Sequence, residues 1–271
     1  MAIEVKKLRF CYGARPVIGD VSFTAEKGDL LAVLGPNGVG KSTLFRCLLG
    51  FLEPVSGEIL ADGKPLSGYS RRELARKIAY IPQSHTPAFD HTVLDSVLMG
   101  MTAQLGVFEQ PGALQRDKAM QMLRTLGLEK LADRGCMKIS GGERQLMLLA
   151  RALVQDASML IMDEPTANLD YGNSCRVMER VQQLGRQGYT IIFSTHDPNQ
   201  AFSYATKVLA LKDGGVMASG APRDVLTEAV LSQLYGIAVA RCEVQTKLGT
   251  KTICMPMPGG EDGGCFAGQM I

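Results

Sequence analysis

The residues with the strongest chemical signature form a glycine-rich segment that ends in a lysine and a serine. Gly35-Pro-Asn-Gly-Val-Gly-Lys-Ser42 fits the pattern G-x-x-x-x-G-K-S, in which glycines let backbone N–H groups surround phosphate oxygens. We expect Lys41 to reach the β- and γ-phosphates of a nucleotide and Ser42 to bind Mg²⁺. The predicted phosphate-binding residues are Gly35, Pro36, Asn37, Gly38, Val39, Gly40, Lys41, Ser42 and Thr43.

Two adjacent carboxylates form the second candidate for chemistry. Asp163 and Glu164 directly follow the apolar run Met159–Met162, and the ends of buried strands are where open α/β sheets bind ligands. An apolar run that ends in Asp-Glu also fits a strand that merely reaches solvent. Downstream of a phosphate loop the catalytic interpretation is favoured: Asp163 would hold the metal through water, and Glu164 would act as general base on the attacking water.

A third candidate is the start of a helix that contains two glycines. In Lys138-Ile-Ser-Gly-Gly-Glu-Arg-Gln, Ser140 is a natural N-cap and Glu143 completes a capping box. Capping does not explain Gly141 and Gly142, because each glycine costs roughly 1 kcal/mol against alanine in a helix. We therefore expect something to approach the backbone closely at this point.

Composition limits the class of protein. With 271 residues, 21% of them charged and a net charge of +2, the chain can bury a full core, and no strong positive field argues for nucleic acid. No apolar run approaches the length of a membrane span, and the first residues lack the apolar core of a signal peptide. We expect a cytosolic protein, or one that is peripheral to the membrane through a partner. The seven scattered cysteines contain no C-x-x-C pair, so reduced thiols are favoured over a metal site.

The hydrophobic pattern supplies the elements that position these candidates. Short apolar runs alternate with helical patterns, as in a parallel sheet covered on both faces; the runs are Leu30–Leu34, Ile78–Ile81, Met159–Met162, Thr190–Phe193 and Lys207–Leu211. Between about 84 and 155 the periodicity is helical, which predicts an inserted all-helical subdomain. The glycine-rich and proline-containing tail, residues 256–264, is predicted to be flexible.

Four motifs in this order, GPNGVGKST, ISGGERQ, LIMDEPTANLD and STHD, resemble those of the ATP-binding subunits of ABC transporters. The resemblance runs from about residue 2 to residue 235. It implies an α/β fold: a P-loop NTPase (RecA-like) core with a mostly parallel sheet, an N-terminal antiparallel β part and the inserted helical subdomain. Residues 1–235 would form the nucleotide-binding domain, and residues 236–271 a partly flexible C-terminal extension.

The resemblance also implies roles that the residues alone do not establish. Tyr12 resembles the aromatic that stacks on adenine, although a strand tyrosine in the core is the plain alternative. Gln83 resembles the residue that senses the metal and couples to the membrane subunits, and His196 the histidine that holds the γ-phosphate. A lone glutamine or histidine at a strand end is more often a satisfied polar residue. Asp170 resembles the loop acid that contacts the partner subunit.

In this family the Ser140-Gly141-Gly142 segment faces the ATP held by a second copy in a head-to-tail dimer. The glycines would then permit backbone approach to a phosphate, and an isolated subunit would hydrolyse ATP weakly. Glu143 stands where the family usually has glutamine. A carboxylate within about 4 Å of the γ-phosphate would cost about 4 kcal/mol per charge pair at an effective dielectric near 20, so we expect Glu143 to fold back onto Ser140.

Further segments resemble importers for chelated metals, which handle iron–siderophore complexes, haem, cobalamin or molybdate; the segments are Phe89–Gly100, Thr195–Gln200 and Ala221–Gly236. Such a subunit works at the cytoplasmic side of the membrane with separate permease subunits and, indirectly, a substrate-binding protein. Two alternatives share every nucleotide motif: a soluble non-transport ABC ATPase, and the ATPase subunit of an exporter.

Overall fold

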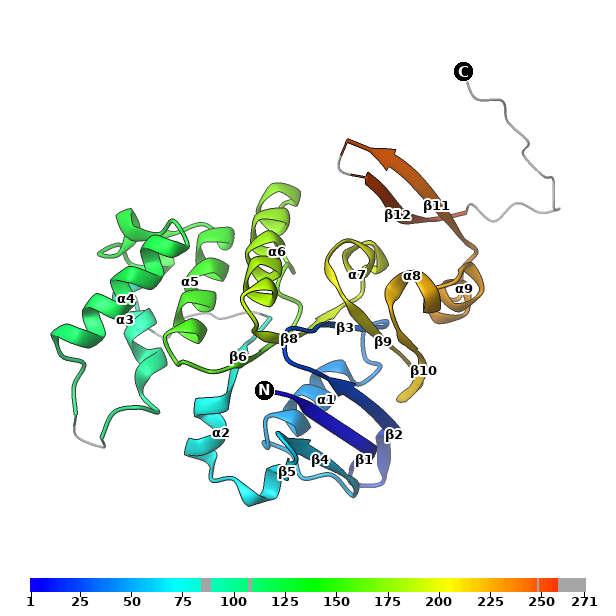
Figure 1. Cartoon of the computed structure of the whole chain (residues 1–271), viewed down its shortest axis with the longest axis horizontal. Coiled ribbons are helices and arrows are strands. Elements are labelled where there is room, and N and C mark those ends of the chain that lie inside the picture. Colours follow the sequence, from blue (N-terminus) through cyan, green and yellow to red (C-terminus); the bar gives the residue numbers. More distant parts are fainter. Residues whose placement is uncertain (84–88, 107–108, 248, 258–271) are drawn as a thin grey trace.

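A six-stranded, mostly parallel sheet forms the centre of the molecule (Figure 1). The computed structural model describes residues 1–83, 89–106, 109–247 and 249–257. The strand order is β10-β9-β3-β8-β7-β6, and only the edge strand β10 runs antiparallel to its neighbour. The strands are β3 (Leu30–Leu34), β6 (Ile78–Ile81), β7 (Met159–Met162), β8 (Thr190–Thr195), β9 (Lys207–Lys212) and β10 (Gly215–Gly220).

Both faces of this sheet are buried, as the continuous apolar runs predict. In β3, Leu30, Ala32 and Leu34 belong to the core on one face, whereas Leu31 and Val33 belong to the core on the other. Successive side chains of a strand point to opposite faces, so an apolar run without alternation requires cover on both sides. The parallel α/β core expected from the sequence is confirmed.

A four-stranded antiparallel sheet of order β2-β1-β4-β5 covers one of these faces, with helix α1 (Lys41–Leu48) in the same core. It is the blue and cyan sheet on the lower right of Figure 1. Its strands are β1 (Ile3–Tyr12), β2 (Arg15–Ala25), β4 (Ser56–Ala61) and β5 (Lys64–Pro65). The predicted N-terminal antiparallel part is therefore present. The 3₁₀ turn η1 (Leu66–Gly68) and helix α2 (Arg71–Lys77) lead from it to β6.

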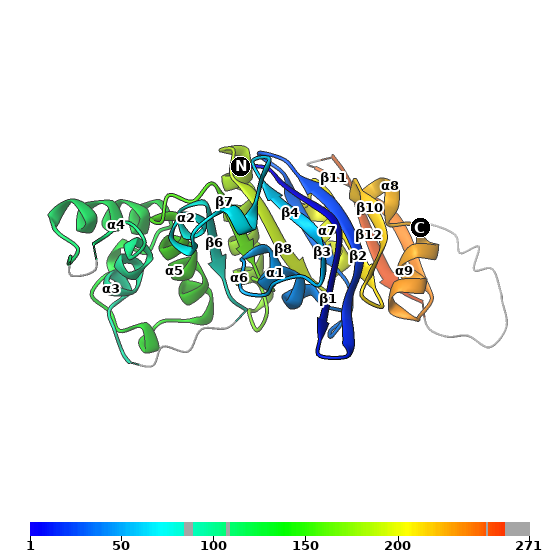
Figure 2. The same ribbon diagram turned by 90° about the horizontal axis from the view of Figure 1, so that it is seen from below.

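Between β6 and β7 the described residues form helices joined by turns and loops, and their β structure is limited to one isolated bridge between Thr92 and Gly135. Its elements are α3 (Val93–Leu98), η2 (Met99–Met101), α4 (Ala113–Thr125), η3 (Glu129–Leu131), η4 (Cys136–Lys138) and α5 (Gly141–Leu153). Figures 1 and 2 show α3, α4 and α5 gathered at one end of the molecule. The predicted start of the helical subdomain at residue 84 lies outside the described residues.

The remaining helices follow the strands of the second half, and a hairpin comes last. The helices are α6 (Tyr171–Arg186), α7 (Pro198–Tyr204), α8 (Pro222–Val225) and α9 (Glu228–Tyr235). Strands β11 (Val239–Thr246) and β12 (Gly249–Pro256) then pair as an antiparallel hairpin beside α7 and α9 (Figure 1). The sequence did not predict this hairpin, because its mostly exposed strands carry no continuous apolar run. Most of the predicted flexible tail lies outside the described residues.

Candidate active site

The glycine-rich loop connects β3 to α1, and sterics explain its glycines. Gly38 and Gly40 have φ of 81° and 109°, a region that side chains disfavour. A Cβ on Gly40 would lie 2.9 Å from Ile18 Cδ1 and 3.1 Å from the carbonyl oxygen of Val17, and one on Gly35 would lie 2.6 Å from the carbonyl oxygen of Leu211. The loop is thus packed closely against β2 and β9. Its backbone N–H groups lie at the N-terminus of α1, the arrangement that binds anions.

Lys41 is buried inside this loop, with only 5% of the residue exposed. Its Nζ donates hydrogen bonds to the carbonyl oxygens of Gly35 at 2.7 Å and Pro36 at 3.1 Å, and it lies 3.5 Å from Glu164 Oε1. Burial lowers the pKa of Lys41, while the nearby carboxylate of Glu164 opposes that change. A partly desolvated ammonium held at this point provides a strong electrostatic contact for a phosphate group.

The two carboxylates sit at the end of β7, one strand away from β8. Ser194 of β8 holds both residues, because its Oγ donates to Asp163 Oδ1 at 2.7 Å and accepts from the backbone N–H of Glu164 at 2.8 Å. Glu164 has φ of 42°, which is unusual for a residue with a side chain. Such strained backbone occurs where surrounding structure fixes a residue, often at a functional site. Ser194 was not predicted from the sequence, since a serine within an apolar strand gives no separate signal.

Side chains from two further strand ends converge on Glu164. Gln83, just after β6, donates from Nε2 to Glu164 Oε2 at 3.1 Å. His196, just after β8, places Nδ1 3.5 Å from Glu164 Oε1. The Glu164 side chain is only 11% exposed and the His196 side chain is 59% exposed. The structure therefore brings together Lys41, Glu164 and the two residues that the family resemblance singled out.

A pocket of about 320 Å³ opens over this group. Its lining contains most of the predicted loop residues together with Gln83 and both carboxylates; the lining residues are Val17, Asn37, Gly38, Gly40, Lys41, Ser42, Thr43, Gln83, Asp163 and Glu164. Tyr12 and His196 are not among them. Tyr12 is 45% exposed at the end of β1, and its ring meets that of Phe10 edge to face at 4.8 Å between centroids. Tyr12 is accessible to a ligand, although it lies outside the pocket lining.

The Ser140 segment lies elsewhere and does not line this pocket. Ser140 caps α5, and the expected capping box is present: the Ser140 N–H donates to Glu143 Oε2 at 2.7 Å, and the Glu143 N–H donates to Ser140 Oγ at 3.3 Å. These bonds to Ser140 lower the pKa of Glu143. Glu143 thus folds back onto the helix start, as the sequence predicts.

Gly142 has a structural reason to lack a side chain that the sequence did not reveal. A Cβ there would lie 2.6 Å from both Cγ and Oδ1 of Asn173, near the start of α6. Asn173 in turn donates from its backbone N–H and its Nδ2 to Asp170 at 2.8 and 2.7 Å, and Asp170 is the N-cap of α6. The first turns of α5 and α6 are therefore in direct contact. Gly141 is exposed, and a Cβ there would lie 3.2 Å from Leu169 Cδ2, a less severe contact that a small shift of the leucine side chain would relieve.

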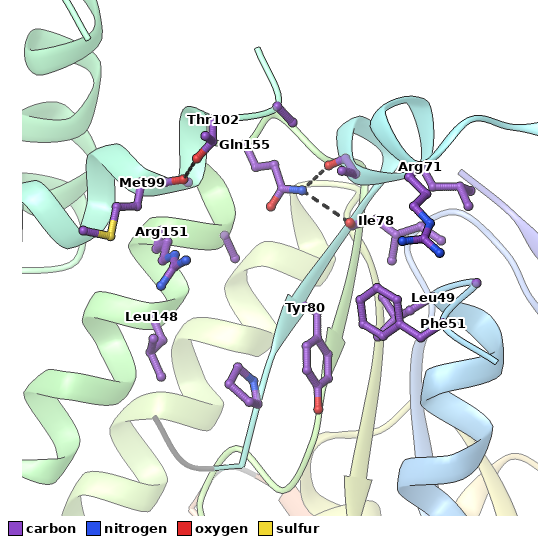
Figure 3. Close-up of a pocket in the computed structure, with 17 residues that line it drawn as sticks. Leu49, Phe51, Arg71, Ile78, Tyr80, Met99, Thr102, Leu148, Arg151 and Gln155 are labelled. Atoms are coloured by element: carbon purple, nitrogen blue, oxygen red, sulfur yellow. Dashed lines mark hydrogen bonds between the residues drawn. The ribbon is translucent and has the colours of Figure 1, made fainter. Parts of the chain in front are cut away.

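A separate groove of about 460 Å³ lies between the core and the helical subdomain (Figure 3). It has an apolar floor that includes Leu49, Tyr80, Pro82 and Leu148, and Phe51 at its edge is 67% exposed. Gln155 spans one end by donating from Nε2 to the carbonyl oxygens of Ala75 and Ile78. Because Pro82 precedes Gln83, this groove lies next to the site built on Glu164.

Among the described residues, no helix is long and apolar enough to cross a membrane, and no group of three His, Cys, Asp or Glu side chains is placed to hold a metal. A phosphate loop with a buried lysine, facing two carboxylates at the end of one buried strand, defines a P-loop ATPase.

Comparison with known proteins narrows this class. Residues 18–167 match the family model described as ABC transporter. The chain is 38% identical over 237 residues to the probable iron chelatin transport ATP-binding protein of Helicobacter pylori, covering 87% of this chain and 93% of that protein. It is 36% identical over 258 residues to the molybdate import ATP-binding protein of Haemophilus influenzae, and the alignment covers 94% of this chain and 96% of that protein. A solved chain of a metal-chelate type ABC transporter in an inward-facing conformation aligns with a TM-score of 0.85 at 36% identity, covering 94% and 97%.

The chain therefore belongs to the ABC transporter family, as one of its ATP-binding proteins, and it binds and hydrolyses ATP.

Proposed function

We propose that this ATPase powers the import of a metal chelate or oxyanion through a separate membrane permease. The observation that carries the proposal is the extent of the likeness to a metal-chelate type transporter, which covers 94% of this chain. The alignment with the molybdate import protein spans 258 residues, more than the 235 residues of the predicted nucleotide-binding domain, so it enters the extension 236–271. The likeness is thus not confined to the motifs that all ABC ATPases share.

In the proposed reaction, the residues in and beside the pocket have separate roles in binding ATP and hydrolysing it. Glu164 accepts a proton from the attacking water, and its position between Gln83 and His196 orients the carboxylate. Lys41 and the N–H groups of the loop bind the phosphates. His196 contacts the γ-phosphate, and Tyr12, exposed at the end of β1, stacks on adenine.

The donor set around the pocket fits Mg²⁺, which prefers oxygen ligands and keeps several waters. Ser42, Gln83 and Asp163 all line the pocket with oxygen-bearing side chains. Asp163 is 6% exposed, and its contact with Ser194 fixes its orientation. We infer that Ser42 and Gln83 would hold the ion directly and that Asp163 would hold it through water; when bound, Mg²⁺ would supply positive charge beside the phosphates.

We also propose that the working unit contains two copies of this chain arranged head to tail. Ser140, Gly141 and Gly142 lie at the N-terminus of a 13-residue helix and do not line the chain's own pocket, so a partner's nucleotide is the anion they can serve. Asp170, an exposed residue that caps α6, would contact the partner in the same interface.

A permease would dock in the groove of Figure 3, at the cytoplasmic face of the membrane. The groove has an apolar floor, Arg71 and Arg151 also line it, and its lining residue Pro82 directly precedes Gln83. A segment bound there would bias Gln83 and through it Glu164, at 3.1 Å. In this proposal residues 1–235 form the nucleotide-binding domain, and residues 236–271 an extension.

The test is to express the chain together with the permease genes of its operon and to reconstitute the resulting complex in liposomes. Detergent-solubilised membranes should yield a complex of this chain with a polytopic protein, and its ATP hydrolysis in liposomes should rise with one substrate among iron–siderophore, haem, cobalamin and molybdate. A Glu164→Gln variant serves as the control, since it should assemble normally and show no stimulation. Absence of any membrane partner would favour a soluble ABC ATPase, and outward movement of substrate would favour an exporter.

A further inference from the structure

The segment that carries His196 is held by parts of the chain that lie far from the nucleotide motifs. His196 follows β8, and its exposed side chain reaches Glu164. The hydroxyl of Tyr235, the last residue of α9, donates a hydrogen bond of 2.9 Å to the backbone carbonyl oxygen of His196. Burial raises the pKa of Tyr235, so the phenol stays protonated and keeps its donor. This contact joins residues that are 39 positions apart in the sequence.

The C-terminal hairpin holds the next turn of the same segment. Asn199 in α7 donates from Nδ2 to the carbonyl oxygen of Cys254 at 3.1 Å, and its Oδ1 accepts from the N–H of Cys254 at 2.8 Å. The Asn199 side chain therefore pairs with β12 as a neighbouring strand would. Two hydrogen bonds to one residue also fix the direction of the side chain, which holds α7 against the hairpin.

This held segment is linked to the loop that follows Glu164. Gln200, also in α7, donates from Nε2 to Thr166 Oγ1 at 3.0 Å. Its Oε1 accepts from Thr195 Oγ1 at 3.1 Å. A displacement of α7 would therefore also act on Thr166, which lies two residues after Glu164, and on Thr195, which directly precedes His196.

We propose that Tyr235 is a positioning residue for ATP hydrolysis, which fixes the backbone of His196 and so the direction in which its imidazole faces Glu164. The inference rests on the proposed role of His196 at the γ-phosphate. Asn199 and β12 hold the adjoining turn, so the C-terminal part of the chain takes part in hydrolysis although none of its described residues lines the pocket around Lys41. We expect the effect on hydrolysis, because the hydrogen bond from Tyr235 goes to His196 and not to a residue of the loop 35–43.

The test uses two matched tyrosine variants of the full chain. Tyr235→Phe removes the donor to His196 and keeps the ring. Tyr69→Phe removes a hydroxyl that donates at the same distance, 2.9 Å, to the carbonyl oxygen of Ala61, in the antiparallel sheet region. Loss of one neutral hydrogen bond corresponds to about a two- to tenfold change. We expect kcat to fall by that factor in Tyr235→Phe with KM for ATP unchanged, and both constants to stay at the parent values in Tyr69→Phe.

A spectroscopic readout separates positioning from a general loss of packing. The chain has three histidines, so the ring signals of ¹³C-labelled histidine can be resolved, and a His196→Ala variant assigns the one of interest. Tyr235→Phe should shift the His196 signal and leave the other two in place, while Tyr69→Phe should shift none. An unchanged kcat, or an unmoved His196 signal, in Tyr235→Phe overturns the inference.

The same variants distinguish failure of this inference from failure of the proposed function. If His196→Ala itself retains the parent kcat, the proposed role of His196 is wrong, and the inference falls with it. If His196→Ala lowers kcat and Tyr235→Phe does not, His196 keeps its role and the positioning by Tyr235 is rejected.

Discussion

Replacement of Gly142 by alanine tests whether contact between two helices of one chain, and not only the approach of a nucleotide, requires a glycine there. The added Cβ would lie 2.6 Å from Cγ and Oδ1 of Asn173 and 2.9 Å from its Cβ. Carbon atoms in contact normally lie about 3.5–4.0 Å apart. One of the two helix starts must therefore move by about 1 Å, or the Asn173 side chain must leave its hydrogen bond to Asp170.

The expected cost follows from two opposing effects. Overpacking a close contact costs about 1–3 kcal/mol, whereas alanine is favoured over glycine by up to about 1 kcal/mol within a helix and by less in its first turn. The net loss in free energy of unfolding is then about 1–2 kcal/mol. A shift of Ser140 by about 1 Å should also lower ATP hydrolysis about 10- to 100-fold, because misplacement on that scale disrupts catalytic geometry.

Thermal or denaturant unfolding and steady-state ATP hydrolysis check both parts. Gly172→Ala is the matched stability control, because its Cβ would lie an ordinary 3.6 Å from Asp170 Oδ1 in the first turn of α6. Asn173→Gly removes the obstructing atoms, so combined with Gly142→Ala it should cost less stability than the two single changes added together. Equal unfolding of the Gly142→Ala and Gly172→Ala variants would refute the steric explanation.

Three further predictions concern single side chains. Glu164→Gln should lower hydrolysis by about 10²- to 10⁴-fold and accumulate an ATP-bound dimer in size-exclusion chromatography, and hydrolysis near the parent rate would remove Glu164 as general base. Lys41→Ala should weaken ATP binding, measured by titration with a labelled ATP analogue. Unchanged affinity and turnover would contradict the proposed contact between Lys41 and the phosphates. The hydrogen bonds to Ser140 hold the pKa of Glu143 below its usual range, so the stabilisation by Glu143 is present above the pKa of the unfolded chain and is lost as the pH falls through the folded pKa. The difference in free energy of unfolding between the parent and Glu143→Gln should therefore shrink on acidification. A large gain in ATP-driven dimerisation in Glu143→Gln would instead indicate that the carboxylate faces the phosphate.

Local sequence patterns were sufficient to predict a feature wherever one continuous segment supplies both the functional residue and its surroundings. The loop from Gly35 to Ser42 could be located because the strand before it, the glycines and the helix after it are contiguous. The Ser140 capping box could be predicted for the same reason, since its two partners are three residues apart. The five parallel strands of the central sheet were evident because burial on both faces demands uninterrupted apolar runs, whereas the edge strand β10, which is only partly buried, was not predicted.

Contacts between distant segments were beyond the reach of such patterns. Ser194 gives no signal of its own, yet it orients Asp163 from the neighbouring strand. Gln83 and His196 were selected through family resemblance, and only the sheet order, which places β7 between β6 and β8, brings both to Glu164. The hairpin β11–β12 was missed because its stability comes from pairing with itself and with α7.

The sequence by itself determined that this chain has a phosphate loop, a pair of carboxylates at a strand end and a capped helix with two glycines. These features depend on neighbours in the chain, whose conformational preferences are local. Only the tertiary structure decided that Asn173 occupies the space a side chain at Gly142 would need, and that Tyr235 reaches the backbone of His196. Such contacts depend on how helices pack against a sheet, and this packing is set by the whole core.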